Sequence, residues 1–386
     1  MRIFFINLLL ISSMLYSSTW FGVDSQTKRA SKSTVVSSNI EESYLHFEFN
    51  GYSASEVETS NGIQNIIDLE GGSSILSLGH PDLDHWTSSI IIPDDGVTSI
   101  EVVSSSYREY YNIEVAPSKG NLTRMIDPSS ISYEYSDVYS VNEFYPGTLA
   151  KLEDPYVIRD LRGQTVVLYP LQYNPITKTL RLYTEIDVKV TTAGHSGENV
   201  LNRQISKGNV SREFNAIYKD LFLNYQNDTR FNYIEDEGSM LVISYGAFMD
   251  VMQPFVDWKN RKGISTEMVD VNDVGSSSGA IESYVDNYYN QNGLTYLLLV
   301  GDVNQIPTPI INGASSDPSY GFIVGNDSYA EVIVGRFSAN NPSELITQVE
   351  RTLTYEQHPD YTAHLDKALG IASSQGPGYG GYTDDQ

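Results

Sequence analysis

The sequence contains no cysteine among its 386 residues. No disulfide can therefore cross-link the fold, and no thiol within these residues can ionise to act as a nucleophile. With a hydrophobic content of 40%, the chain is long enough for roughly two or three domains that each bury a core. Its stability must accordingly come from those cores and from any ions that it binds.

Positive charge is scarce as well, with 24 Lys and Arg residues against 49 Asp and Glu residues and a formal net charge of -25. No basic stripe offsets this charge, which would repel a phosphate backbone, so nucleic acid is not expected as a partner. Calcium prefers hard oxygen ligands such as carboxylates and is the more suitable charged partner.

Long apolar runs are absent apart from one at the N-terminus. That run extends from Ile3 to Leu15, follows Arg2, and precedes small Ser and Thr residues. This layout predicts a secretory signal peptide over residues 1–19, and with it a protein that is secreted or held at a bacterial cell surface. A buried helix or an uncleaved anchor is the alternative. No later run is long enough to cross a bilayer, so we expect no membrane span after signal removal.

From residue 20 to residue 192 the sequence consists of short β-rich runs separated by Gly, Pro, Asn and Asp, such as YLHFEFNGYSA, TSSIIIP and TLRLYTEIDVKVTT. Helical periodicity is almost absent, so we predict a β-rich, sandwich-like domain. Residues 193–237 are more polar and contain one amphipathic patch, REFNAIYKDLFLNY. We interpret this stretch as a connecting arm, with an ordinary surface helix as the alternative.

After residue 238 the pattern changes to strands that alternate with helices. The expected strands are MLVIS, ISTEMVDV, TYLLLVGD, EVIVGRF and KALGIASS, and the expected helices are PFVDWKNRKG, SGAIESYVDNYYNQNG and NPSELITQVERTLTYE. Such alternation predicts an α/β domain with a mainly parallel sheet over residues 238–386. Ligands of such sheets bind beyond the carboxyl ends of the strands.

Acidic residues border two of these strands. Asp302 ends TYLLLVGD, whereas Asp327 and Glu331 crowd the approach to the apolar run from Val332 to Val334. Two carboxylates so close together would repel each other. Either water solvates them on a turn or a cation such as calcium holds them together, and the spacing alone leaves both alternatives open.

Three other motifs are weaker. The residues of HPDLDH could in principle bind zinc, but Pro81 favours a turn there. GSSSG satisfies the nucleophile-elbow pattern around Ser277, which a Ser/Gly-rich turn also matches easily. GPGYGG has the spacing of a dinucleotide-binding loop, but no helix follows it, so we interpret it as a flexible loop.

Several distinct motifs in order resemble one known family. The stretches FVDWKNRKGISTEM, LTYLLLVGDVNQIP and SDPSYGFIVGNDSYAEVIVGRFSANNPSELITQVERTLTYE resemble the start of the catalytic domain of gingipain-type cysteine peptidases. Upstream, LSLGHPDLDHWTSSIIIP and RGQTVVLYPLQYNPITKTLRLYTEIDVKV resemble the propeptide of the same family. The resemblance implies a secreted cysteine endopeptidase zymogen that cleaves proteins or peptides. Its β-rich prodomain would dock on a caspase-like catalytic domain, which is truncated in this chain.

The resemblance also implies a calcium site. Carried over residue by residue, the side chains of Asp302, Asp327 and Glu331 and the main-chain oxygens of Val324 and Tyr329 would hold the ion. A cation there would relieve the repulsion between the carboxylates.

The remaining residue roles follow from the same resemblance. The catalytic Cys and His of the family lie downstream of these residues, so no catalytic residue is expected here and the chain alone should be inactive. Asp384, with Asp385 as its rival, would select arginine in the substrate. Activation would cut the arm between Arg230 and Phe231.

The rival hypothesis is a non-catalytic, calcium-binding secreted protein that keeps the peptidase-like scaffold for adhesion. A fold does not guarantee a function, and a degenerate relative could equally have lost its cysteines.

Overall fold

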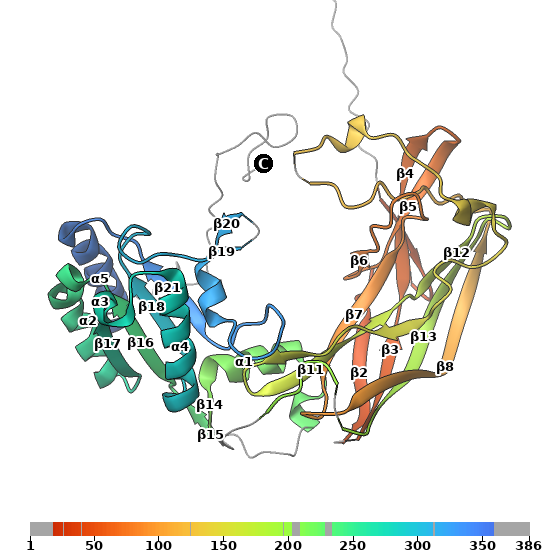
Figure 1. Ribbon diagram of the computed structural model, residues 1–386. Helices are drawn as coiled ribbons and strands as arrows, with labels where there is room; N and C mark the ends of the chain where they lie inside the picture. The colour runs from red at the N-terminus through yellow and green to blue at the C-terminus, as the bar shows by residue number, and fades with distance from the viewer. Residues whose placement is uncertain are drawn as a thin grey trace, which may run out of the picture.

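The computed structural model describes residues 18–25, 27–39, 41–123, 125–195, 197–202, 209–227, 234–311 and 313–358. Residues 18–202 of this set form a β-rich part, and residues 238–358 form an α/β part. Figure 1 shows the β-rich part on the right and the α/β part on the left, meeting near α1 (Arg212–Leu221) and β11 (Leu161–Leu168). The predicted fold class, a β-rich domain followed by an α/β domain with a mainly parallel sheet, is confirmed.

The β-rich part is built mainly from antiparallel strands in three sheets, ordered β12-β13-β3-β2 with β8 also on β13, β10-β11-β7-β6 with β9 also on β11, and β1-β4-β5. The strands are β1 (Thr19–Gly22), β2 (Lys32–Ser38), β3 (Glu42–Glu48), β4 (Gly51–Thr59), β5 (Gly62–Asp68), β6 (Ser73–Ser74), β7 (Asp84–Ile91), β8 (Val97–Tyr111), β9 (Ala150–Leu152), β10 (Tyr156–Ile158), β11 (Leu161–Leu168), β12 (Leu171–Asn174) and β13 (Thr179–Ala193). Short 3-10 turns, η1 (Pro128–Ser130) and η2 (Asp137–Ser140), lie in the long loop after β8.

Alternation along the strands builds the core of this part. In β3 every second residue is buried, so Leu45 and Phe47 point inward while their neighbours remain partly exposed. They pack in one cluster with Ile186 of β13, from their own sheet, and with Ile90 of β7 and Val166 of β11, from a second sheet. The core thus lies between sheets, as in a sandwich.

The α/β part contains a parallel sheet of order β17-β16-β18-β21. Its elements are β16 (Ser239–Ser244), η4 (Gly246–Phe248), α2 (Met249–Arg261), β17 (Ser265–Asp270), α3 (Val271–Val274), α4 (Ser278–Asn292), β18 (Tyr296–Val300), β19 (Ile310–Ile311), β20 (Ala314–Ser315), η5 (Asp317–Gly321), β21 (Ile333–Phe337) and α5 (Pro342–Gln357). Two clusters cover the two faces of this sheet. One contains Phe255 of α2 and Leu345 of α5, and the other contains Ile281 and Val285 of α4.

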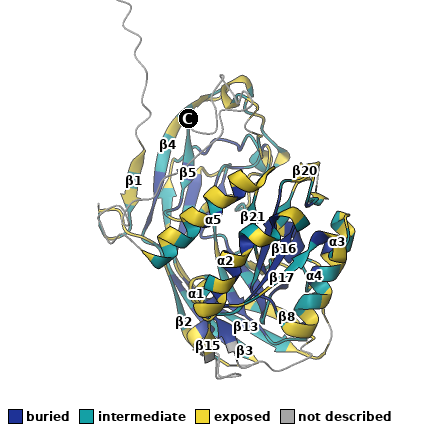
Figure 2. Ribbon diagram, turned by 90° about the vertical axis from the view of Figure 1, so that its left-hand side faces the viewer, coloured by how far each residue is buried: buried dark blue, intermediate teal, exposed yellow. Residues whose placement is uncertain are grey.

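Helices on both faces explain why these strands are apolar without alternation, since both sides of the sheet are buried. Figure 2 shows α2, α4 and α5 with exposed outer sides. Helix α5 begins where the sequence predicts, because Asn341 caps it by accepting the Glu344 N–H at 3.1 Å and Pro342 takes the first helical position.

A middle segment connects the two parts. It contains β14 (Asn209–Ser211), α1 (Arg212–Leu221), η3 (Tyr225–Asn227) and β15 (Ile234–Asp236), and β14 pairs with β15 in parallel. The amphipathic patch of the sequence forms α1, whose Phe214 and Tyr218 are buried beside Ile158 and Leu161 of the β-rich part. The segment therefore packs on the strands β10 and β11 rather than spanning solvent.

Several predictions concern residues outside the described ranges. These are most of the signal peptide (1–17), the cleavage position at Arg230 and Phe231, the strand KALGIASS, and Asp384. Within the described ranges, no helix is long and apolar enough to cross a membrane.

Candidate functional site

The predicted acidic residues lie at opposite edges of the parallel sheet. Strand β18 pairs with β21 so that Tyr296 faces Ile333 and Val300 faces Phe337. Asp302 follows β18 and Glu331 precedes β21, so a strand of five residues, about 16 Å long, separates their edges. The structure therefore brings Asp327 and Glu331 together and places Asp302 apart from them. In a parallel sheet, the residues that precede the strands lie at one edge, and the residues that follow the strands lie at the opposite edge.

Glu331 is completely buried and fully supplied with hydrogen bonds. Its Oε2 accepts the N–H groups of Ile323 at 2.7 Å and Val324 at 2.9 Å, and its Oε1 accepts the N–H of Arg159 at 3.2 Å. Burial raises the pKa of the Glu331 carboxyl to about 7, while the three N–H groups act in the opposite direction. A residue of the β-rich part thus completes the surroundings of a buried acid in the α/β part.

Asp327 has a similar arrangement nearer the surface. Its Oδ1 accepts the N–H of Tyr329 at 3.0 Å, and its Oδ2 accepts the N–H of Val157 at 2.9 Å. Together the two carboxylates accept five main-chain N–H groups, of which Val157 and Arg159 supply two from the loop and strand at β10. Main-chain amides stabilise the charge here, a third possibility beside the water and the cation that the sequence left open.

The five residues expected to bind calcium do not converge. Asp302 lies at the far edge, and the main-chain N–H groups of Val324 and Tyr329 point at the carboxylates. In the described part of the chain, no three His, Cys, Asp or Glu side chains gather where they could share an ion. The complete five-residue set thus does not fit a single calcium ion, whereas four of its members do lie in one loop.

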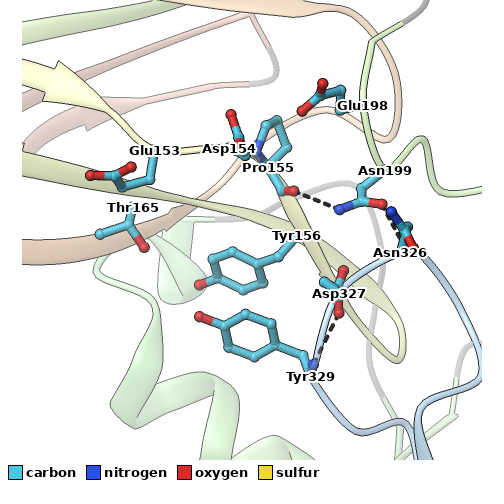
Figure 3. A pocket seen from close by; sticks show the side chains of 10 residues that line it. All are labelled: Glu153, Asp154, Pro155, Tyr156, Thr165, Glu198, Asn199, Asn326, Asp327 and Tyr329. Carbon is cyan, nitrogen blue, oxygen red and sulfur yellow. Dashed lines mark hydrogen bonds between the residues drawn. The ribbon is translucent and has the colours of Figure 1, made fainter. Parts of the chain in front are cut away.

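A cavity of about 660 Å³ lies between the two parts, beside this loop. Figure 3 shows the rings of Tyr156 and Tyr329 stacked in it, with centroids 4.0 Å apart and planes inclined by 14°. Asn199 bridges the parts at its rim, because its Nδ2 donates to the Pro155 carbonyl at 2.9 Å and its Oδ1 accepts the Asn326 N–H at 2.8 Å. Stacking and amide bridging therefore reinforce the contact at the carboxylates.

The opposite edge carries Asp302. Its Oδ1 accepts the Val303 N–H at 2.9 Å and the Ser338 hydroxyl at 3.2 Å, and the first of these bonds is the main reason why its pKa is lowered. Nearby, Arg336 holds Asp317 through two bonds of 2.6 and 2.7 Å and donates to the carbonyls of the loop after β18. This is the carboxyl edge, where ligands of such sheets are expected.

Two of the three weaker motifs have structural roles, and the third, GPGYGG, lies outside the described residues. Ser277 caps α4, since its Oγ accepts the Ala280 N–H at 3.2 Å, so the GSSSG stretch is a helix start rather than a nucleophile elbow. In HPDLDH, the buried Asp84 accepts the Leu69 N–H at 2.8 Å and the Ser74 hydroxyl at 3.0 Å. Both motifs thus stabilise local structure.

Sequence reasoning missed Arg159, which makes four hydrogen bonds across the interface. Its main chain bonds Glu331, and its guanidinium donates to the carbonyls of Leu294 and Glu331. The only local signal is an Arg in the two-residue loop between two strands, where Asn or Gly is preferred. Its partners lie more than a hundred residues further along the chain, so no local pattern could reveal them.

Two family models match the chain in succession. The model described as Propeptide_C25 matches residues 24–222, and the model described as Peptidase family C25 matches residues 233–386. The first range covers the β-rich part from residue 24 onward together with α1, and the second covers the α/β part.

Curated relatives agree with these matches. Gingipain R1 of Porphyromonas gingivalis is 41% identical over 339 residues, which cover 86% of this chain and 34% of that protein. Gingipain R2 of the same organism is 38% identical over 371 residues, which cover 94% of this chain and 50% of that protein. The chain therefore spans between a third and a half of the length of these relatives.

Among solved structures, the complex of Porphyromonas gingivalis RgpB pro- and mature domains is 36% identical. The match covers 51% of this chain and 97% of that chain, with a TM-score of 0.47.

Proposed function

This chain belongs to peptidase family C25, and we propose on that basis that it is the N-terminal portion of a secreted cysteine endopeptidase zymogen. The observation that carries the proposal is the order of the two family matches, the propeptide over residues 24–222 and the peptidase over residues 233–386. We divide the chain into a signal peptide (1–19), a propeptide domain (20–192), a connecting arm (193–237) and the start of the catalytic domain (238–386).

The chemistry proposed is thiolate attack on a peptide carbonyl, with a histidine as proton shuttle and hydrolysis of the acyl-enzyme. No cysteine occurs in the 386 residues, and the proposal therefore includes a nucleophile that is encoded further downstream. The chain by itself is then inactive. Its contribution is to build one edge of the catalytic sheet, where Asp302 and the loop held by Arg336 lie.

The propeptide is proposed to stay docked on the catalytic domain until the arm is cut. Two kinds of contact between the parts support docking: the N–H groups of Val157 and Arg159 on two carboxylates, and the stacked Tyr156 and Tyr329. Within the arm, β14 pairs with β15 across the proposed cut. We place the cut between Arg230 and Phe231, in the stretch that connects α1 to β15.

Proteins and peptides are the proposed substrates, and Asp384 is proposed to favour arginine at the cleaved bond by pairing with its guanidinium. The names Gingipain R1 and Gingipain R2 describe the matched relatives and not this chain. For this chain the preference rests on the position of Asp384 after the KALGIASS stretch.

Calcium is proposed for the loop of residues 324–331 without Asp302. Asp327 and Glu331 offer carboxylates there, and the carbonyl oxygens of Val324 and Tyr329 belong to the same loop. When bound, the ion would supply positive charge against the two carboxylates. In the present arrangement, main-chain N–H groups perform that role.

The second candidate is a non-catalytic, calcium-binding secreted scaffold, which the absence of cysteine from these 386 residues favours. Sequencing the encoding DNA beyond the codon for Gln386 separates the two. A continuing frame that encodes a His-Gly pair, and then a Cys after a further apolar strand, supports the peptidase. A stop codon directly after Gln386 would leave no nucleophile and reject it.

A further inference from the structure

The loop between β10 and β11 consists of Arg159 and Asp160, because Ile158 pairs with Leu161. Arg159 has a φ of 51°, in the left-handed region that suits Gly, Asn and Asp. A long side chain such as that of Arg is uncommon in this backbone conformation. A conformation held against its intrinsic preference points to a contact that requires this particular side chain.

That contact lies in the α/β part. Nη1 of Arg159 donates to the main-chain oxygens of Leu294 and Glu331, the latter at 2.8 Å, and Nη2 donates to Oγ1 of Thr295 at 3.4 Å. Leu294, Thr295 and Glu331 are all almost completely buried. The three acceptors precede β18 and β21, so they form a small polar recess at the amino edge of the sheet.

Aromatic rings close the recess on two sides. The guanidinium carbon lies 5.7 Å from the centre of the Tyr289 ring in α4 and 4.8 Å from that of Phe214 in α1. Asp160 sits 3.4 Å from Nε and accepts the Tyr218 hydroxyl at 3.0 Å. The Arg159 side chain is 13% exposed. Its charge is therefore removed from most of the water and is compensated by carbonyls, rings and one carboxylate.

We propose that Tyr289, Leu294, Thr295 and Glu331 form a guanidinium socket on the catalytic domain, and that Arg159 is the anchor that holds the propeptide in it. The forked, planar guanidinium can reach two carbonyls at once, which a lysine ammonium on its flexible stem cannot match. The inference rests on the proposed function only in calling the two parts propeptide and catalytic domain.

The position of the socket gives the anchor a distinct role. It lies at the amino edge of the sheet, whereas Asp302 marks the carboxyl edge where substrates of such folds bind. The strength of propeptide docking can therefore be set at Arg159 without altering the substrate edge.

The test is hydrogen–deuterium exchange by mass spectrometry on the full 386-residue chain. Arg159→Asn suits the left-handed loop but removes the fork, so the loop itself is retained. We expect peptides covering 321–332 and 154–163 to exchange at least tenfold faster than in the unmodified chain. Arg159→Lys should accelerate them severalfold. Arg181→Ala is the matched control, because Arg181 packs on Tyr107 and Phe144 within the β-rich part, and it should leave peptides 321–332 unchanged.

Unchanged exchange of peptides 321–332 in Arg159→Asn would overturn the proposal, as would an equal effect of Arg181→Ala on those peptides. If Arg159→Asn does not fold, the exchange of peptides 321–332 is measured in Arg159→Lys instead. Exchange at the same rate as in the unmodified chain would again overturn the proposal. The readout involves no peptide hydrolysis. Loss of the proposed peptidase function would thus leave this result standing, and failure of the anchor would leave the peptidase function untouched.

Discussion

The main-chain N–H of Arg159 lies 3.2 Å from Oε1 of Glu331, and the guanidinium of the same residue lies 2.8 Å from the Glu331 carbonyl. One residue of the β-rich part thus bonds both the side chain and the backbone of a single buried acid in the α/β part. The hydrogen bonds around Glu331 consequently extend across the interface, and a substitution at Glu331 must affect both parts.

Replacing Glu331 by alanine should destabilise the chain strongly. The N–H groups of Ile323, Val324 and Arg159 would each lose their acceptor in a buried site, a loss of about 3 kcal/mol in the free energy of unfolding. Denaturant unfolding of the 386-residue chain measures it. Glu350→Ala, on the exposed side of α5, is the control and should change stability by less than about 0.5 kcal/mol. Equal effects of both changes would contradict the role assigned to Glu331.

Asp82 should make the β-rich part less stable as the pH rises. Burial, with Asp84 and Asp68 adding to it, raises the pKa of Asp82 to about 6. The folded state takes up a proton near pH 6 and the unfolded state near pH 4, so stability falls as the pH rises between these values. Asp82→Asn should therefore stabilise the chain by about 1 kcal/mol at pH 7.5 and leave it nearly unchanged at pH 4. Calorimetric unfolding temperatures at the two pH values provide the comparison, and an identical shift at both would refute it.

Calcium should act through the loop of residues 324–331 and not through Asp302. A ligand that binds only the folded state raises the unfolding temperature. We expect calcium to raise it relative to chelator in the unmodified chain and in Asp302→Ala, and to have no effect in Asp327→Ala. A calcium response that disappears in Asp302→Ala as well as in Asp327→Ala would instead support the complete five-residue site predicted from sequence. No response in any chain would dismiss calcium from this loop.

Activation should depend on Arg230. N-terminal sequencing of the mature protein is expected to begin at Phe231, and Arg230→Gln should slow processing at least tenfold. Arg212→Gln is the control, since Arg212 is an exposed arginine in the same arm with a side chain that is 57% accessible. A mature N-terminus elsewhere would reject the site. Equal slowing by both changes would show that general loss of charge in the arm is responsible.

Patterns within single elements allowed most of the fold to be predicted. Alternation in β3 and the apolar runs of β16 and β18 identified strands, and Asn341 with Pro342 located the start of α5. These signals are local, since each depends on which neighbours a residue meets within its own strand or helix.

The candidate site could be predicted only in part, because its geometry depends on how distant elements pair. Asp327 and Glu331 are close in sequence and in space. Asp302 lies at the other edge of the sheet, and the register of β18 and β21 that puts it there is a tertiary property. Arg159 escaped notice because its partner Glu331 follows 172 residues later. No periodicity encodes a contact between separate domains.

The central claim, a latent cysteine peptidase held by its own propeptide, is tested most directly on the complete gene product. Hydrolysis of a peptide with arginine at the cleaved bond is measured before and after the propeptide is removed, with and without a thiol-alkylating reagent. The account predicts negligible hydrolysis before removal, a large rise after it, and its loss on alkylation. Full hydrolysis with the propeptide still bound, or hydrolysis that alkylation does not reduce, would contradict it.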